Sequence, residues 1–278
     1  MSHTNGSNGV SILDEEKGLD RTQTAVTMSP EMFEKLYLTP KVPLAGNNIK
    51  RFANPTPVGL IGFNIAGFSF AMILMGWGGA SGASPIASDF ISSGSGIFFF
   101  GAMLLIVGMI GEWIMGNFFS MITMGLFGIF WLSFGLLQLP TLQLISPYIT
   151  ADDPTGANSP EFNASLALFL LVWGFAIFTL TIFSLKTNAV FATIYVILTA
   201  FSFVMSGCYW RLSAGDTGMA VGLQKAGGAL LFAAATLGWY LTVVIIAGEM
   251  RFPLPLPVGD LSHFWPKTDQ ELADVQRK

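Results

Sequence analysis

Residues 94–139 form one nearly unbroken apolar run, and this run decides most of what the chain can fold into. A helix crosses a bilayer with ~20 apolar residues, so the run is too long for one span and suits two. Gly116 and Asn117 provide the break, because glycine often ends a helix and asparagine often caps the next one. The sequence therefore predicts two membrane-spanning helices joined by a tight turn.

Four further apolar runs of similar length flank this pair. Only 11% of the residues are charged, whereas a soluble domain carries about a quarter. We therefore predict an all-α membrane protein with six transmembrane helices. The expected spans are about 58–79, 94–115, 118–139, 164–185, 189–209 and 226–248.

The chain divides into three parts. Residues 1–52 are polar and are expected to be disordered, since they hold too little apolar surface to fold. Residues 53–250 form the six-helix transmembrane domain. Residues 251–278 are a Pro-rich tail, in which alternate prolines over 253–257 either form an extended strap on the membrane domain or simply end the last helix.

The distribution of lysine and arginine predicts the orientation. Both tails are rich in them, whereas the loops 80–93 and 140–163 have none, so both termini are expected in the cytoplasm. We expect a multi-pass protein of the plasma membrane. Asn163-Ala164-Ser165 matches a glycosylation acceptor, but it lies against the start of a span and its use is not expected.

Several classes of chemistry are excluded by what the chain lacks. The two histidines, His3 and His263, lie in the tails, and Cys208 is the single cysteine, so no metal site is expected within the membrane. Nucleotide-binding motifs are also missing. We expect no enzyme activity, no cofactor and no nucleic-acid partner.

The entry to the first span has an unusual pattern. Asn54 is predicted to cap this helix, with Pro55 at its first position, Pro57 in its first turn and Gly59 allowing close approach of another backbone. One interpretation is a capped helix start at the membrane surface. The other is an anion site, because a helix N-terminus presents unpaired N–H groups and a positive dipole end.

Few polar groups lie within the spans. Glu112 is one turn from the end of its span and is either an interfacial carboxylate or a functional group. The remaining polar candidates are hydroxyls and amides such as Thr123, set among many aromatic residues. Such a path suits a small, weakly polar or transiently neutral solute better than a bare multivalent ion.

Taken in order, the motifs of residues 50–260 resemble those of the acetate uptake transporter family, the succinate–acetate permeases and their fungal relatives. They are Asn-Pro-Thr-Pro-Val-Gly-Leu at 54–60, Gly-Glu and Gly-Asn-Phe-Phe within 111–119, Phe-Gly-Ile-Phe-Trp-Leu-Ser at 127–133, and Leu-Pro-Val-Gly-Asp at 256–260. The long polar N-terminal tail is similar to that of the fungal members.

The resemblance implies a homo-hexamer in which each protomer has its own path. It also implies that each protomer carries acetate and related short monocarboxylates together with a proton. Bacterial relatives also carry succinate. It implies a constriction of Phe63, Phe127 and Leu198; the family commonly has tyrosine where this chain has Phe127. The residues expected to bind the substrate or line its path are Asn54, Pro55, Pro57, Gly59, Phe63, Glu112, Asn117, Thr123, Phe127, Gly128, Trp131 and Leu198.

Other functions remain open at this stage. A passive channel for weak acids would need the same path as a proton-coupled transporter. Fungal relatives are also linked to ammonium export, and an acid-responsive membrane sensor could use the same fold.

Overall fold

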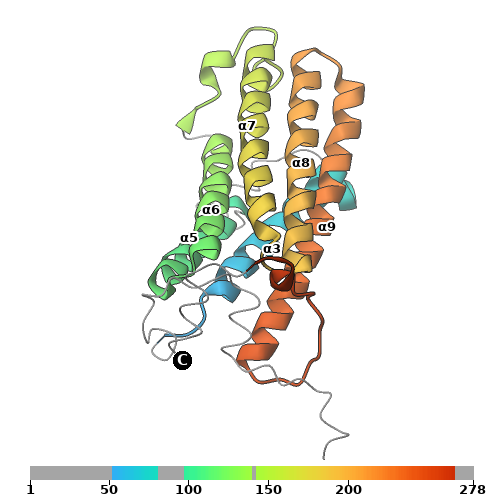
Figure 1. Ribbon diagram of the computed structural model, residues 1–278. Helices are drawn as coiled ribbons and strands as arrows, with labels where there is room; N and C mark the ends of the chain where they lie inside the picture. Colours follow the sequence, from blue (N-terminus) through green and yellow to red (C-terminus); the bar gives the residue numbers. More distant parts are fainter. Residues whose placement is uncertain (1–51, 81–96, 140–141, 267–278) are drawn as a thin grey trace, which may run out of the picture.

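The structure is a computed structural model that describes residues 52–80, 97–139 and 142–266. The predicted disordered tail lies outside the described residues except for Phe52. Figure 1 shows long helices side by side, with the described ends of the chain at the same end of the bundle, which we call the terminal side. Six helices are long and apolar enough to span a membrane, which confirms the predicted fold: α3 (Thr56–Met75), α5 (Ile97–Met115), α6 (Phe118–Gln138), α7 (Pro160–Ser184), α8 (Ala189–Ser213) and α9 (Thr217–Glu249).

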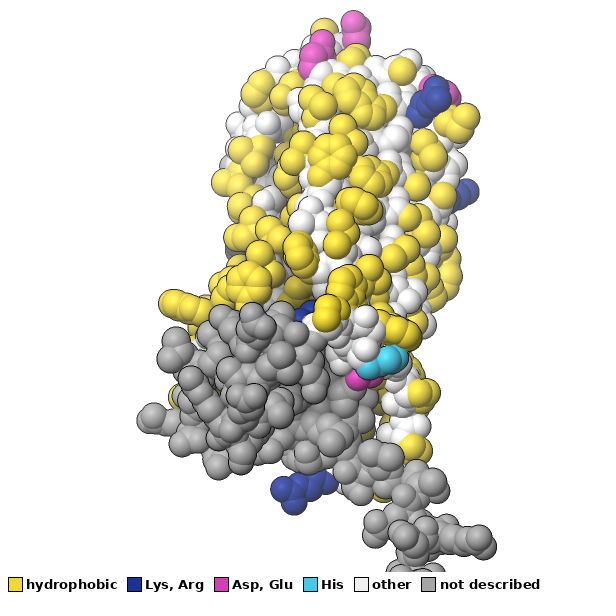
Figure 2. Space-filling view, viewed as in Figure 1, with side chains coloured by type: hydrophobic (Ala, Val, Ile, Leu, Met, Phe, Trp, Pro, Cys, Tyr) yellow, Lys and Arg dark blue, Asp and Glu magenta, His cyan; other side chains and the backbone are white. Residues whose placement is uncertain are grey.

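The six helices form a ring. Five pairs pack backbone to backbone in the order α7, α8, α9, α3, α5, α6. The ring closes between α6 and α7 through aromatic side chains, with Trp173 stacked on Phe130 at 4.7 Å and edge-on to Phe127 at 5.6 Å between ring centroids. Large side chains therefore span the seam where these backbones lie farther apart. Figure 2 shows hydrophobic side chains over most of the visible side of the bundle, with most charged side chains near its ends.

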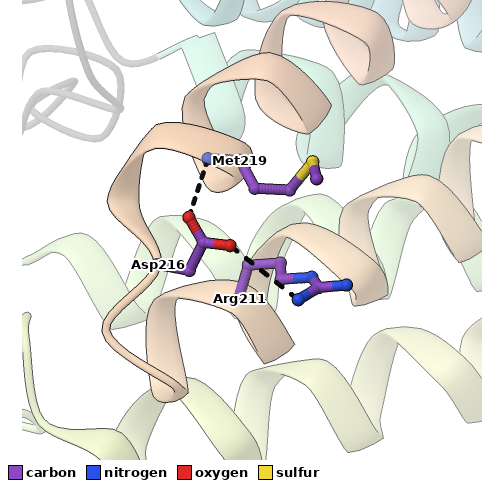
Figure 3. Close-up of polar contacts among 3 residues, drawn as sticks. All are labelled: Arg211, Asp216 and Met219. Carbon is purple, nitrogen blue, oxygen red and sulfur yellow. Dashed lines mark hydrogen bonds and ion pairs between the residues drawn. The ribbon is translucent and has the colours of Figure 1, made fainter.

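The last helix is longer than predicted. It begins at Thr217 rather than near 226, because Asp216 caps it there. The Asp216 carboxylate accepts the Met219 N–H at 3.1 Å, and it also lies 3.8 Å from the Arg211 guanidinium (Figure 3). Its first turns include polar residues such as Lys225, which lowered the apolar signal without preventing a helix. The predicted start was wrong for that reason.

Asn163 lies inside α7, not in a loop. Ser159 caps this helix, and Pro160 occupies its first position. The Asn163 side chain is 2% exposed, and its amide nitrogen donates to the carbonyl oxygens of Ala157 and Ser159 at 3.0 and 2.9 Å. Both hydrogens of the nitrogen that glycosylation would modify are therefore bonded within the chain.

The α6–α7 connection is organised by Asp153. Its carboxylate accepts the Thr155 hydroxyl at 2.7 Å and the Asn158 N–H at 2.8 Å. The Thr155 hydroxyl bond is the main reason that the pKa of Asp153 lies below its usual value. Because the folded pKa is lowered, the carboxylate stabilises this loop above its unfolded pKa, and that contribution is lost as the pH falls through the folded value.

The residues after α9 form an extended strap, residues 252–261, which returns to the turn between α7 and α8. The Ala189 and Val190 N–H groups, at the start of α8, donate to the carbonyl oxygens of Gly259 and Val258 at 2.7 and 3.3 Å. The Tyr240 hydroxyl donates to the Pro257 carbonyl oxygen at 2.6 Å. The structure therefore favours the strap interpretation of the alternate prolines over a simple helix terminator.

We expect Val258→Asp to lower the midpoint of thermal unfolding by about 5–10 °C, because a buried side chain would be replaced by a charge. Val258 is 5% exposed and belongs to the core, whereas Leu254 of the same strap is exposed. Leu254→Asp is therefore the matched control and should leave the midpoint nearly unchanged. Thermal unfolding of purified protein in detergent measures both, and equal midpoints for the two variants would contradict a docked strap.

Candidate functional site

Two cavities lie inside the ring, one after the other. We call the larger one the terminal-side chamber. It extends to Phe63 from Thr56, at the start of α3, and from Asn188, just before α8. The space between its lining atoms, including its open margin, is about 680 Å³. The smaller, the loop-side chamber, has about 250 Å³ of such space and reaches Trp173 and Leu231 farther along the bundle. The interior thus contains a discontinuous path along its axis.

The boundary between the chambers is formed by residues that line both. These are Phe63 from α3, Phe127 from α6 and Leu198 from α8. All three are buried, and the rings of Phe63 and Phe127 meet edge to face with centroids 5.5 Å apart. The structure brings together the three residues expected to form a constriction, and they interrupt the path with apolar groups.

A buried carboxylate lies beside the terminal-side chamber. Glu112 on α5 is 0% exposed; it accepts the hydroxyl of Thr56, which lines the chamber, and the Asn117 amide at 2.6 Å. The prediction that the Asn117 side chain caps α6 was wrong: Asn117 precedes the helix, but its amide bonds Glu112 instead. Glu112 is therefore a buried group and not an interfacial, solvated carboxylate.

Asn54 links the start of α3 to the end of α9. Its side-chain oxygen accepts the Thr56 N–H at 3.0 Å, while its amide nitrogen donates to the Glu249 carboxylate at the end of α9 at 2.9 Å. The helix begins at Thr56, one residue later than predicted, with Pro55 in the capping position. The Asn54 amide is thus bound to a carboxylate of this chain outside the chamber.

Four other predicted residues lie at the start of α3 or where helices meet. Pro55 contacts the α5 backbone where Gly111 leaves room, and Pro57 lies in the first turn of α3. Gly59 lines the terminal-side chamber and leaves room for the Met124 side chain. A Cβ added at Gly59 would lie 2.5 Å from the Met124 sulfur. Gly128 faces α5, where an added Cβ would lie 3.0 Å from Ile106, so it serves helix packing.

Trp131 belongs to the loop-side chamber. Its ring stacks on Phe98 with centroids 5.6 Å apart, and within the described part of the chain its buried indole nitrogen has no hydrogen-bond partner. Packing against aromatic rings holds it in place.

Tyr195 is a residue that the sequence did not mark. It lines the terminal-side chamber, and its hydroxyl oxygen lies 2.5 Å from that of the predicted residue Thr123. An isolated tyrosine in an apolar run carries no local signal, and only the folded ring brings the two hydroxyls together across its interior. Within the described ranges, no three metal-binding side chains meet.

These features define a class of protein: a six-helix membrane protein with an interior path of two apolar chambers separated by an aromatic constriction. Residues 37–263 match the GPR1/FUN34/yaaH family, and the chain belongs to that family. This confirms the resemblance to the acetate uptake transporters drawn from the sequence motifs.

Three relatives illustrate the range of the family. The protein alcS of Aspergillus fumigatus is 39% identical over 87% of this chain and 88% of its own length. The acetate transporter protein patA of Aspergillus clavatus is 28% identical over 78% of this chain and 82% of its own. The ammonia transport outward protein 2 of Saccharomyces cerevisiae is 30% identical over 84% and 77%. Where these names state a function, it is transport and not an enzyme activity.

A solved structure shares the fold. The bacterial acetate channel SatP superposes with a TM-score of 0.55 at 22% identity and covers 75% of this chain and 99% of its own. At that identity the likeness supports the six-helix architecture alone.

Proposed function

We propose that this protein carries acetate and related short-chain monocarboxylates across a membrane, together with a proton. The observation that supports this most directly is the pair of chambers separated by Phe63, Phe127 and Leu198. A bare carboxylate loses its hydration in such a constriction at high cost, whereas burial favours the neutral acid. Family relatives named as acetate transporters make acetate the first substrate to test.

Glu112 is the residue that we propose to exchange the proton. It is buried within a spanning helix, where ionisable groups are costly and usually functional. Its bond to Thr56 connects it to the terminal-side chamber. The acid and its proton would therefore meet on the terminal side of the constriction.

The setting of this activity is also part of the proposal. We place the protein in the plasma membrane with both tails in the cytoplasm, as the lysine and arginine distribution predicts. The terminal-side chamber then faces the cytoplasm. We further propose that the protomers assemble as a homo-hexamer, each with its own path.

Uptake of labelled acetate into proteoliposomes containing only this protein tests the proposal. With an inward proton gradient we expect accumulation above equilibrium that a protonophore abolishes. Equilibration without accumulation would overturn proton coupling and establish a passive channel. Absence of flux from folded protein would overturn acetate transport and favour a sensor or another solute.

Ammonia is the second candidate solute, since one relative is named as an ammonia transport outward protein. Neutral ammonia would also cross an apolar constriction without losing a charge. Efflux of labelled methylammonium from the same proteoliposomes tests it. Methylammonium efflux without acetate flux would make ammonia the substrate.

A further inference from the structure

The hydroxyl of Thr123 is bonded across the ring rather than to the backbone of its own helix. A hydroxyl inside a helix usually donates to the carbonyl oxygen four residues earlier, which satisfies it within lipid. Thr123 instead bonds the Tyr195 hydroxyl across the ring, from α6 to α8. The hydroxyls that follow the usual pattern are those of Ser165, Thr179, Thr181, Thr193, Ser202, Thr236 and Thr242, and that of Thr181 also lies 2.9 Å from the Thr199 hydroxyl.

The position of this pair is set by two of the three helices that form the constriction, α6 and α8. Thr123 precedes Phe127 by one helical turn on α6, and Tyr195 precedes Leu198 by about one turn on α8. Both helices run away from the terminal side, so the hydroxyls lie just before the constriction within the terminal-side chamber. A molecule approaching from that side meets the pair before it meets the apolar groups.

The Tyr195 side chain is held firmly. It is 1% exposed and lies between Phe119 and Phe191, with ring centroids 5.6 and 5.2 Å away. These rings fix the orientation of its hydroxyl. A fixed polar group in a mostly apolar pocket gives orientation and specificity to a small ligand.

The chemistry of two bonded hydroxyls determines which ligand fits. One hydrogen is used between the two oxygens, which leaves one donor and free lone pairs. A protonated carboxyl group also offers one donor and one acceptor, whereas a carboxylate offers acceptors only. The pair therefore complements the neutral acid better than the anion.

We propose that Tyr195 and Thr123 form a recognition site for the neutral carboxyl group of a short monocarboxylic acid, whose alkyl end faces Phe63, Phe127 and Leu198. This inference deepens the proposed function and rests on it. It names the form of the substrate that is bound on the terminal side of the constriction. It also explains how this chain keeps a hydroxyl near the constriction although residue 127 is phenylalanine.

The test uses Tyr195→Phe and Thr123→Val, which remove a hydroxyl each and keep the side-chain shape, together with the double variant. In the proteoliposome assay we expect each single change to raise the acetate concentration for half-maximal uptake about tenfold, as for one lost hydrogen bond, with a maximal rate within about twofold of the unmodified chain. The double variant should be no worse than the worse single one, because the hydroxyls act as a unit. Thr123→Ser should restore uptake, and Thr193→Val, which removes an exposed hydroxyl bonded to its own helix, is the control.

Acetamide and methanesulfonate separate the neutral from the charged form. Acetamide is neutral and offers one donor group and one acceptor, so we expect it to compete with acetate in the unmodified protein and to lose this effect in both variants. Methanesulfonate is an anion and should compete in none. Unchanged half-saturation in both variants, or competition by methanesulfonate equal to that by acetamide, would overturn the proposal, as would a fall in maximal rate alone. If one variant is not recovered folded, the other carries the test.

The same variants distinguish this inference from the proposed function. If the unmodified protein takes up no acetate, stabilisation against thermal unfolding by acetamide is measured instead. Stabilisation of the unmodified chain but not of Tyr195→Phe would support the recognition site while the transport proposal fails. Equal responses of the two proteins would overturn the site.

Discussion

Phe127→Ala should let the protein take up bulkier monocarboxylates, such as lactate and benzoate, about tenfold faster or more, which corresponds to a barrier lowered by about 1.4 kcal/mol. The Phe127 ring is edge-on to Phe63 and lines both chambers. Removing it joins the two chambers and widens the narrowest part of the path. Uptake of a series of labelled acids of increasing size measures the effect.

One variant controls this result, and a second tests the same position in another way. Ile129→Ala on the same helix alters an exposed side chain away from the chambers and should leave the size profile unchanged. Phe127→Tyr keeps the ring and adds a hydroxyl at the boundary, so it should change the ratio of acetate to succinate uptake. The constriction hypothesis would be wrong if Phe127→Ala and Ile129→Ala gave the same size profile in folded protein.

Glu112→Gln should abolish accumulation of acetate above equilibrium while leaving downhill acetate flux in place. The change removes the group that exchanges a proton but keeps an oxygen that accepts the Thr56 hydroxyl. Asn117 can adapt to this change, because its side-chain oxygen has no partner among the described residues. If the Asn117 side-chain amide rotates by about 180°, this oxygen takes the place of the nitrogen that bonds Glu112 and accepts an N–H of the glutamine. Uptake with and without a proton gradient measures this loss.

Glu112→Ala provides the structural counterpart. It leaves the Thr56 hydroxyl and the Asn117 amide without this acceptor. Each buried group left without a partner lowers the free energy of unfolding by about 1–3 kcal/mol. We therefore expect lower thermal stability for Glu112→Ala but not for Glu112→Gln. Glu249→Gln, at the exposed carboxylate bonded to Asn54, should leave accumulation nearly intact. Accumulation by Glu112→Gln at the level of the unmodified chain would exclude Glu112 as the proton-exchanging group.

The sequence predicted the six spans because membrane helices are set mainly by apolar length. The first turns of α9 were missed, since residues from Thr217 onward are polar enough to leave the apolar window although Asp216 caps them as a helix. The turn at Gly116 was predicted correctly; its φ of 77° is one that glycine adopts easily.

The site was predictable only where family motifs marked it. Phe63, Phe127 and Leu198 were named from motif positions, and the fold brings them to one boundary. Glu112 is bonded to Thr56 at the start of α3, and Asn54 is bonded to Glu249 at the end of α9. Such contacts depend on helix packing, which local patterns do not encode.

The strap after α9 has a consequence for how the protein is made. The first N–H groups of α8 are bonded to carbonyl oxygens at Val258 and Gly259, which the ribosome adds only after all six spans exist. Until then the Ala189 and Val190 N–H groups lack these acceptors, and Asn188 caps the helix alone. A chain truncated at the end of α9 would hold every span yet lack these two bonds. Any fusion partner should therefore be attached beyond Trp265, whose indole donates to the Leu185 carbonyl oxygen at 2.9 Å.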